Sequence, residues 1–453
     1  MAAIVGVTAV ALPHAGPSLD FAQGTSVAGH IGDRTLTPLP VIQNAPGAWP
    51  LLIGYLAAFG CACAAYAAIC RLPDPGARTI WIAFALGAAA MLAVGFYPTS
   101  DPYAYALYAL EAGPLRLDPY VTQSLAGTSL PWAAQLLAIF PDPDAYVRHC
   151  NYGPLAVFAY AALALPLAHA PLVAYLFAER MFGIACVALT GLALARSAAG
   201  VEGRKRLATY VLHPLVLTEF VAFSHGDALM LLLLALAFVL WQRDAFAFAA
   251  AACVAAGATR SVAALALVAL FVALARVRPA AVPRAALGAL VAALALGGAS
   301  LAAYGEISLG GAPAFNHFAA PIAFVATLLG VGSLAAAVVL QGAVGAAAIV
   351  VVLRRWWLQR RAALAWLSFG ALAGLPAIYP HYLGWVAGVA ALRPGPRFAF
   401  VARVATIVAP VWYVARMNLV APPQPSALAY GAALVLTWGS AIAAFTSKRG
   451  LEE

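Results

Sequence analysis

The sequence has 453 residues, of which 64% are hydrophobic and only 9% are charged. Soluble globular domains carry roughly a quarter of charged residues, so this composition excludes an ordinary soluble protein. The formal net charge is +9, but the basic residues form short clusters at the ends of apolar runs, a pattern that excludes a nucleic-acid-binding face.

Apolar runs follow one another along most of the chain. An α-helix needs roughly 20 residues to cross a bilayer. Clean uncharged runs cover 48–70, 79–98, 285–305, 318–353, 362–378 and 424–447, and less clean stretches cover 152–170, 171–195, 207–224, 227–242, 245–276 and 398–416. Because strand-like alternation is absent, we expect an all-α, polytopic membrane protein with about 11 to 13 transmembrane helices.

The expected domain organisation is simple. Residues 48–447 form a single transmembrane domain, residues 1–47 an outer N-terminal arm, and residues 448–453 a short cytoplasmic tail. Five of the six cysteines lie in apolar runs, where they act as small hydrophobic residues, and no paired spacing typical of metal ligands occurs.

Basic clusters orient the predicted helices. By the positive-inside rule, the segments 71–78, 276–284 and 354–361 and the C-terminus face the cytoplasm, so the loop after 79–98 lies outside. One conflict arises: if 152–170 and 171–195 both cross, Arg204, Lys205 and Arg206 fall outside, against the rule. We therefore expect one of these two stretches not to cross.

The outer loop 99–151 is the most polar part of the chain. It is roughly fifty residues long, well beyond a usual connection. It holds five of the 16 acidic residues, namely Asp101, Glu111, Asp118, Asp142 and Asp144. Residues 102–113 have helical spacing and predict an amphipathic helix on the membrane surface, with Asp101 at its start.

Asp101 has two interpretations. Ser100 and Asp101 followed by Pro102 are typical of a capped helix start with no chemical role. An acid at the outer end of a predicted span, beside several tyrosines, is also typical of a base facing a membrane-borne substrate. The two are compatible, because a capped aspartate is also a positioned one.

A second polar group interrupts the apolar stretch 219–241. Asp227 precedes an uncharged run and is expected to cap it, while an adjacent His225 at membrane level is costly for a purely structural role. Glu219 is a candidate buried partner. Arg260 interrupts another apolar stretch, so it must face a carboxylate, such as Asp227 or Glu219, or an anionic ligand such as phosphate.

Two later outer loops add imidazoles. His317 lies in 310–321, and His381 lies in 378–385 beside Tyr382 and Trp385. The aromatic residues alone fit an interfacial belt. Together with Asp101, His225 and Asp227, however, both histidines fall on the predicted outer face, and such convergence is typical of a site.

The order of the polar motifs resembles that of a known family. The motifs SDPYAY (100–105), LDPYV (117–121), NYGPLAVF (151–158), SHGDALM (224–230), GATRSVAAL (257–265) and PHYLGW (380–385) are similar to those of the GT-C superfamily of integral-membrane glycosyltransferases. Within it, the likeness is to bacterial mannosyltransferases that use polyprenyl-phosphate mannose. It covers roughly 95–390, and its departures include Gly226 where the family often has Asn and Arg260 where it often has Lys.

This resemblance implies an inverting transfer of a hexose, mannose by likeness, to a lipid or glycan acceptor at the outer face of the bacterial cytoplasmic membrane, within the cell envelope. Asp101 matches the catalytic base. The resemblance implies donor and phosphate binding by Arg260, His225, Asp227, His381 and Tyr382. For the acceptor or the loop it implies Tyr103, Tyr105, Asp118, Tyr120, Asn151, Tyr152 and His317.

Other interpretations stay open from the sequence. A transporter or flippase would line a pathway with the same acids, although no convincing inverted repeat is present, and an inert membrane scaffold is a further alternative. The sequence points to no certain cofactor, and Asp101, Asp118 and the histidines offer ligands for a possible divalent cation. Partners are expected to be the lipid-linked donor, the acceptor and membrane lipids, with no nucleic acid.

Overall fold

The computed structural model describes residues 30–31, 34–35, 48–92, 101–121, 128–133, 135–136, 150–307, 334–356, 360–375, 378–416, 432 and 435–444. The longer helices of the N-terminal half are α2 (Ala48–Arg71), α3 (Ala77–Leu92), α4 (Asp101–Ala112), α6 (Pro154–Ala164), α7 (Leu172–Arg196), α8 (Gly200–Val211), the π-helix η3 (Val216–Ala222) and α9 (Asp227–Gln242). Those that follow are α10 (Phe246–Gly257), the 3-10 turn η4 (Ser261–Ala264), α11 (Leu265–Val277), α12 (Val282–Tyr304), α14 (Leu334–Trp356), α15 (Arg360–Gly374), α16 (Pro380–Ala390) and α17 (Pro396–Arg416).

Strands make up very little of the described chain. Two residues, β1 (His30–Ile31), pair antiparallel with two others, β2 (Arg34–Thr35). Every other element described is helical. The predicted all-α fold is therefore confirmed.

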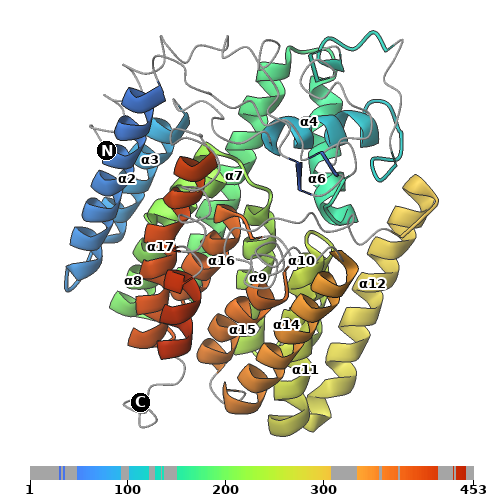
Figure 1. Cartoon of the computed structure of the whole chain (residues 1–453). Helices are drawn as coiled ribbons and strands as arrows, with labels where there is room; N and C mark the ends of the chain where they lie inside the picture. The colour runs from blue at the N-terminus through green and yellow to red at the C-terminus, as the bar shows by residue number, and fades with distance from the viewer. Residues whose placement is uncertain are drawn as a thin grey trace.

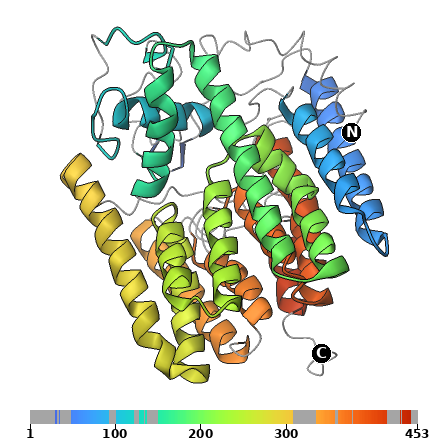
Figure 2. The same ribbon diagram turned by 180° about the vertical axis from the view of Figure 1, so that it is seen from behind.

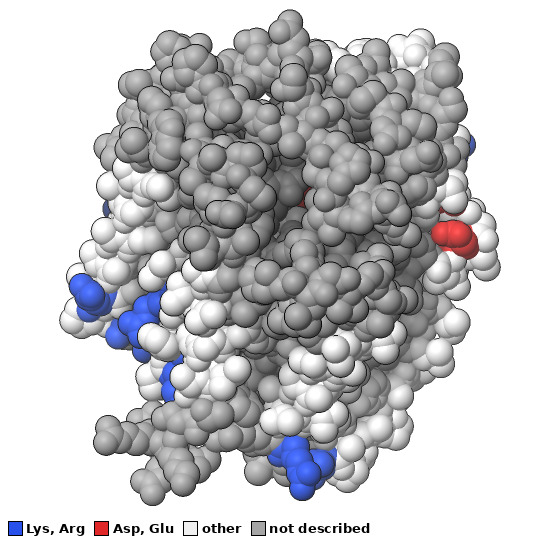
Figure 3. All heavy atoms as spheres, in the orientation of Figure 1, with Lys and Arg blue, Asp and Glu red and all other residues white. Residues whose placement is uncertain are grey.

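The helices form two regions that differ in position. Most of the long apolar helices pack together in one region, in which α10 lies against α9 and α12, and α14 lies against α15. Helices α4 and α6 pack against each other at one end of the molecule, at the top of Figures 1 and 2. The lysines and arginines visible in Figure 3 lie mostly toward the opposite end.

Membrane-spanning capacity is present in several helices. By length and composition, two described segments qualify, α7 and Pro279–Tyr304, or three if η3 and α9 form one bent span. Eight shorter apolar helices of 10–17 residues accompany them. The polytopic membrane character is confirmed, while the count of about 11 to 13 spans stays a prediction.

Element lengths favour one answer to the conflict over residues 152–206. Helix α6 has 11 residues and continues into the 3-10 turn Leu165–Leu167, and the two together are shorter than the roughly 20 residues that a bilayer crossing needs. Helix α7 has 25 residues and does have the length. Arg204 lies 2.7 Å from Asp74, in the turn after α2 that is predicted to be cytoplasmic. The basic cluster at 204–206 thus lies beside this turn, as the charge rule favours.

The prediction of a surface-lying amphipathic helix at 102–113 is wrong. Helix α4 does begin at Asp101, but nine of its twelve residues are buried. It packs in a hydrophobic cluster with side chains from α6 and α7 and with Trp132. The error has a physical cause: its tyrosines bury large apolar rings against other aromatic rings, so a pattern that suits an interface also suits a tyrosine-rich core.

Glycine allows one close helix contact that supports the membrane region. A Cβ on Gly288 of α12 would collide with the backbone of Ala247 in α10, whereas a Cβ on Gly298 of the same helix would meet nothing within 4 Å. The small residue therefore sets the distance between α10 and α12.

We predict that Gly288→Ala destabilises the protein, because overpacking against backbone costs about 1–3 kcal/mol. Thermal unfolding of the purified protein in detergent checks this: the melting temperature falls for Gly288→Ala and is unchanged or slightly higher for the matched control Gly298→Ala. Equal melting temperatures for the two variants would contradict the described packing.

Candidate active site

A sharp break between η3 and α9 collects three polar residues inside the apolar region. The two helices are bent by 119° at this break. Ser224 adopts φ +53, a left-handed conformation that only a few per cent of non-glycine residues adopt. The His225 amide then donates to the carbonyl of Glu219 at 2.9 Å. As a result, Glu219 in η3, His225 in the break and Asp227 at the start of α9 come close together.

Asp227 does not cap α9 as expected. The N-cap is Gly226, which makes no side-chain cap bond, and Asp227 is the first residue of the helix. Its carboxylate instead faces Arg260. Gly226 is required here because a Cβ would collide with the hydroxyl of Tyr160.

His225 joins two carboxylates. Its Nδ1 lies 3.0 Å from Oδ2 of Asp101, and its Nε2 lies 3.3 Å from Oε2 of Glu219. The expected partnership of Glu219 with this polar group is therefore confirmed. The Asp101 side chain is 34% exposed, whereas those of His225 and Glu219 are 2% and 0% exposed. Asp101 is thus the member of this trio that a substrate can reach.

Two tyrosines connect the Asp101 side of the site to Arg260. The Tyr105 hydroxyl lies 3.4 Å from Nδ1 of His225 and 2.6 Å from the Tyr152 hydroxyl. Arg260 Nη2 donates to that same Tyr152 hydroxyl at 2.7 Å. Burial raises the pKa of Tyr105 well above its ordinary value, and the nearby Tyr152 and Asp101 raise it further. Tyr105 therefore keeps its proton and acts as a neutral hydrogen-bonding group.

Arg260 lies between a carboxylate and aromatic rings. Its Nε donates to Oδ1 of Asp227 at 3.2 Å. Its guanidinium carbon lies 3.9 Å from the centre of the Tyr152 ring and 5.5 Å from that of Tyr382. Ion pairing with Asp227, one of the two predicted partners, is confirmed. Cation–π contacts with the two tyrosines add to the stabilisation of this charge.

His381 completes the arrangement from the first turn of α16. Its ring stacks on that of His225, with centroids 4.0 Å apart and an angle of 26° between planes. Its Nε2 lies 3.8 Å from Oδ2 of Asp227. Starting from either histidine, contacts therefore run through a closed circuit of side chains. We call this circuit, together with the two carboxylates attached to it through His225, the polar ring. The circuit consists of Tyr105, Tyr152, His225, Asp227, Arg260 and His381, and the attached carboxylates are those of Asp101 and Glu219.

The polar ring draws on five separate segments of the chain. Helix α4 supplies the Asp101 side, the residues before α6 supply Tyr152, and the break before α9 supplies His225 and Asp227. Figure 3 shows acidic atoms deep in a hollow on the face viewed there. The predicted convergence of Asp101, His225, Asp227 and His381 is observed.

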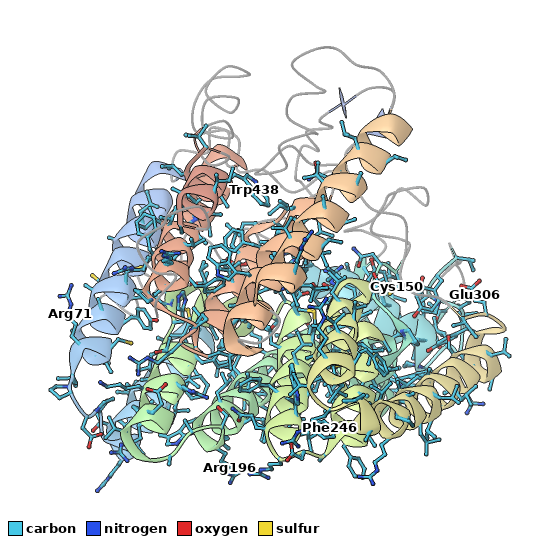
Figure 4. The ribbon with its side chains drawn as sticks, turned by 90° about the horizontal axis from the view of Figure 1, so that it is seen from below. Arg71, Cys150, Arg196, Phe246, Glu306 and Trp438 are labelled. Carbon is cyan, nitrogen blue, oxygen red and sulfur yellow. The ribbon has the colours of Figure 1, made fainter. Side chains whose placement is uncertain are left out.

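Some predicted residues lie elsewhere. Asp118 accepts a hydrogen bond from the Tyr120 amide at 2.9 Å, and the Tyr120 ring meets Tyr304 at the end of α12, with centroids 5.9 Å apart. These contacts place Asp118 and Tyr120 where the loop packs against α12. Figure 4 shows Cys150, near the end of this loop, and Glu306, just after α12, on the same side of the molecule, across from Arg71.

Four other predicted residues have different outcomes. Tyr103 is half-buried in α4 and Asn151 is half-buried just before Tyr152. Tyr382 contacts His381, with ring centroids 4.3 Å apart. His317 lies outside the described residues.

Sequence reasoning did not single out Tyr160 and Glu179. The Tyr160 ring stacks on Tyr105 with centroids 5.1 Å apart and planes 7° apart. Glu179 is 1% exposed in the middle of α7, and neither carboxylate oxygen has a hydrogen-bond partner among the described residues. An acid and an arginine, Glu179 and Arg180, inside a predicted span were the available signal, because charges at such depth are costly.

An apolar cavity lies beside the polar ring. It is lined from α7 to α11 and from α15 and α16, almost entirely by aliphatic and aromatic side chains. Val262 and Ala263, just after Arg260, and Trp385, one turn after His381, belong to its wall. The cavity therefore begins close to the charged groups and extends among the membrane-region helices.

Three side chains of the polar ring are close enough together to hold a metal ion. One ligand atom each of Asp101, His225 and His381 lies within 4.8 Å of the others. Nitrogen and carboxylate donors of this kind suit transition metals and zinc.

Comparison with known proteins gives the family. Residues 4–276, more than half of the chain, match the family profile described as alpha-(1->6)-mannopyranosyltransferase, N-terminal domain. No curated protein and no solved structure matches the chain. The matched region contains every member of the polar ring except His381. The chain therefore belongs to the alpha-(1->6)-mannopyranosyltransferase family, whose members are GT-C mannosyltransferases that depend on polyprenyl-phosphate mannose.

Proposed function

We propose that this enzyme transfers mannose from polyprenyl-phosphate mannose to a hydroxyl of a lipid or glycan acceptor, with inversion at the anomeric carbon. The observation that carries the proposal is the polar ring itself. It joins a partly exposed carboxylate to a buried guanidinium, beside an apolar cavity. The 1->6 linkage in the family description supports an acceptor sugar that offers its 6-hydroxyl.

Arg260 is the proposed phosphate-binding residue. Its described hydrogen bonds use Nε and Nη2, so Nη1 remains for a phosphate oxygen. A planar guanidinium suits phosphate because its donors match two oxygens at once. Tyr152 supports this role, since its hydroxyl accepts from Nη2 and fixes the plane of the guanidinium.

The apolar cavity is the proposed site of the polyprenyl tail. Its wall continues from Arg260 through Val262 and Ala263. A phosphate at Arg260 would therefore have its lipid chain pointing among α9, α10 and α11.

Asp101 is the proposed catalytic base. Its carboxylate would take the proton of the acceptor hydroxyl as the acceptor oxygen bonds to the anomeric carbon. The bond from that carbon to the phosphate oxygen breaks, and its electron pair leaves with the phosphate, where Arg260 stabilises the charge. Attack and departure on opposite faces of the carbon invert its configuration in one step.

The outer face of the bacterial cytoplasmic membrane is the proposed location of the site. Basic turns at Arg71 and at 204–206 lie together through the contact of Arg204 with Asp74. Helices α4 and α6, which border the site, lie at the other end of the molecule (Figures 1 and 2). With the basic turns in the cytoplasm, Asp101 faces outward.

Transport is the alternative that the sequence left open. A transport pathway would distribute charged groups through the membrane region. In this structure Asp101 and Glu219 both contact His225, whereas Asp227 lies near His381 and pairs with Arg260, so the four charged residues belong to one cluster. Together with the family, this clustering favours a catalytic site.

We predict that Asp101→Asn lowers mannosyl transfer by about 100-fold or more, because loss of a positioned general base typically costs this much. The assay measures label transfer from radiolabelled polyprenyl-phosphate mannose in membranes that hold equal amounts of folded protein. The control is Glu306→Gln, which neutralises an exposed acid beyond the end of α12. Wild-type rates in Asp101→Asn would refute the assignment of the base.

For Arg260, replacement by lysine separates charge from geometry. Arg260→Lys keeps the charge that pairs with Asp227 but loses the planar arrangement of donors. We therefore expect the KM for the donor to rise about tenfold, equivalent to ~1.4 kcal/mol. The KM for the acceptor should change little. Steady-state kinetics with each substrate varied would measure this. Arg278→Lys, at an exposed pair with Asp244, is the matched control. An unchanged donor KM in Arg260→Lys would place the phosphate elsewhere.

A further inference from the structure

The polar ring contains three potential ligands held from three helical elements. Asp101 is in the first turn of α4, His225 is in the break before α9, and His381 is in the first turn of α16. Their ligand atoms lie within 4.8 Å of one another. The two histidines are nearly inaccessible, at 2% and 3% exposure. The group is thus assembled by the tertiary fold.

Each histidine has a carboxylate near its Nε2 atom. Glu219 lies 3.3 Å from Nε2 of His225, and Asp227 lies 3.8 Å from Nε2 of His381. Histidines that bind metals commonly donate their second ring nitrogen to a carboxylate, which fixes the ring and increases its basicity. The Nε2 atoms of both histidines and Oδ2 of Asp227 are buried and form no hydrogen bond with the described residues. Buried polar atoms usually have a hydrogen-bond partner, which a ligand or a small contraction of the site would supply here.

Three carboxylates lie next to the two histidines. Those of Asp101 and Glu219 contact His225, and that of Asp227 lies near His381 and pairs with Arg260. A divalent cation held at the histidines would therefore be close to negatively charged groups that attract it.

We propose that Asp101, His225 and His381 bind one divalent transition-metal ion, of the Zn²⁺ or Mn²⁺ class. Two imidazoles and one carboxylate select such ions over Mg²⁺ and Ca²⁺, which prefer oxygen ligands. Ligands of a single ion with bonds of about 2.1 Å lie at most ~4.2 Å apart. The widest of the three separations would therefore have to shorten on binding, whereas Nδ1 of His225 and Oδ2 of Asp101 are already 3.0 Å apart.

The role of the ion rests on the proposed function. A lipid phosphate approaching Arg260 would meet three nearby carboxylates, and a dication at the histidines would offset that repulsion. Because Oδ2 of Asp101 faces His225, the ion would take this oxygen. The second oxygen of the same carboxylate would then serve the acceptor.

Cobalt(II) is the probe for the site. The full chain is purified with an affinity tag that contains no histidine, reconstituted in lipid nanodiscs, stripped with EDTA and titrated with Co²⁺ while visible absorption is recorded. We expect one Co²⁺ per chain, displaced by Zn²⁺ and not by excess Mg²⁺. His381→Asn lowers the affinity by about 100-fold or more, whereas His169→Asn, at an exposed histidine, leaves it unchanged.

Protein stability separates loss of a ligand from loss of the fold. Thermal unfolding is measured for each variant without metal, and if His381→Asn does not fold, His225→Gln replaces it in the same titration. Absence of a one-to-one cobalt complex in the wild type, or unchanged affinity in the folded histidine variant, overturns the site.

Transfer assays keep this inference distinct from the proposed function. Full mannosyl transfer by the metal-free protein overturns the role of the ion and leaves the proposed function intact. Conversely, a cobalt complex in a protein that transfers no mannose from polyprenyl-phosphate mannose, with or without metal, supports the site and overturns the proposed function.

Discussion

Charges buried among apolar helices must find partners, and this constraint governs the centre of the structure. Glu219 and Asp227 are fully buried, and Arg260 is nearly so. Leaving any one of them unpaired would cost several kcal/mol. The break between η3 and α9 meets the constraint because it brings the carboxylates of Glu219 and Asp227 close to the imidazole of His225. Neighbouring helices then supply the remaining partners.

The same contacts that stabilise these charges also arrange the chemistry. Asp101 is at the accessible edge of the polar ring, Arg260 is inside it, and two protonated tyrosines lie between them. Because these tyrosines connect the base to the cation, neither can move without disturbing the other. Such preorganisation favours a reaction in which positive charge must already be in place when the phosphate departs.

Much of the site could be predicted because polar residues are conspicuous in an apolar sequence. His225, Asp227 and Arg260 each interrupt an uncharged stretch, which indicates either a buried partner or a ligand. The start of α4 at Asp101 followed from local rules for the first turn of a helix. The family resemblance then placed these residues in roles. The placement of Asp101 and His381 at the same end of the helices followed from charge at the ends of the apolar runs.

Other features depend on packing between distant segments and could not be predicted from local pattern. The periodicity of 102–113 fits both an interface and a tyrosine-rich core, and only the contacts of α4 with α6 and α7 decide between them. The stacking of Tyr160 on Tyr105 has no counterpart in sequence spacing. The short length of α6 and of the 3-10 turn after it, and the salt bridge that places Arg204 beside Asp74, likewise depend on the tertiary structure.

The central claim is that one polar ring holds both the base and the phosphate of the donor. A cryo-electron microscopy map of the full chain in nanodiscs with polyprenyl-phosphate mannose tests it most directly. The account predicts phosphate density within hydrogen-bond distance of Arg260, the lipid tail in the cavity beyond Val262, and the anomeric carbon facing Asp101. Phosphate density bound away from Arg260, or a sugar that faces away from Asp101, would contradict it.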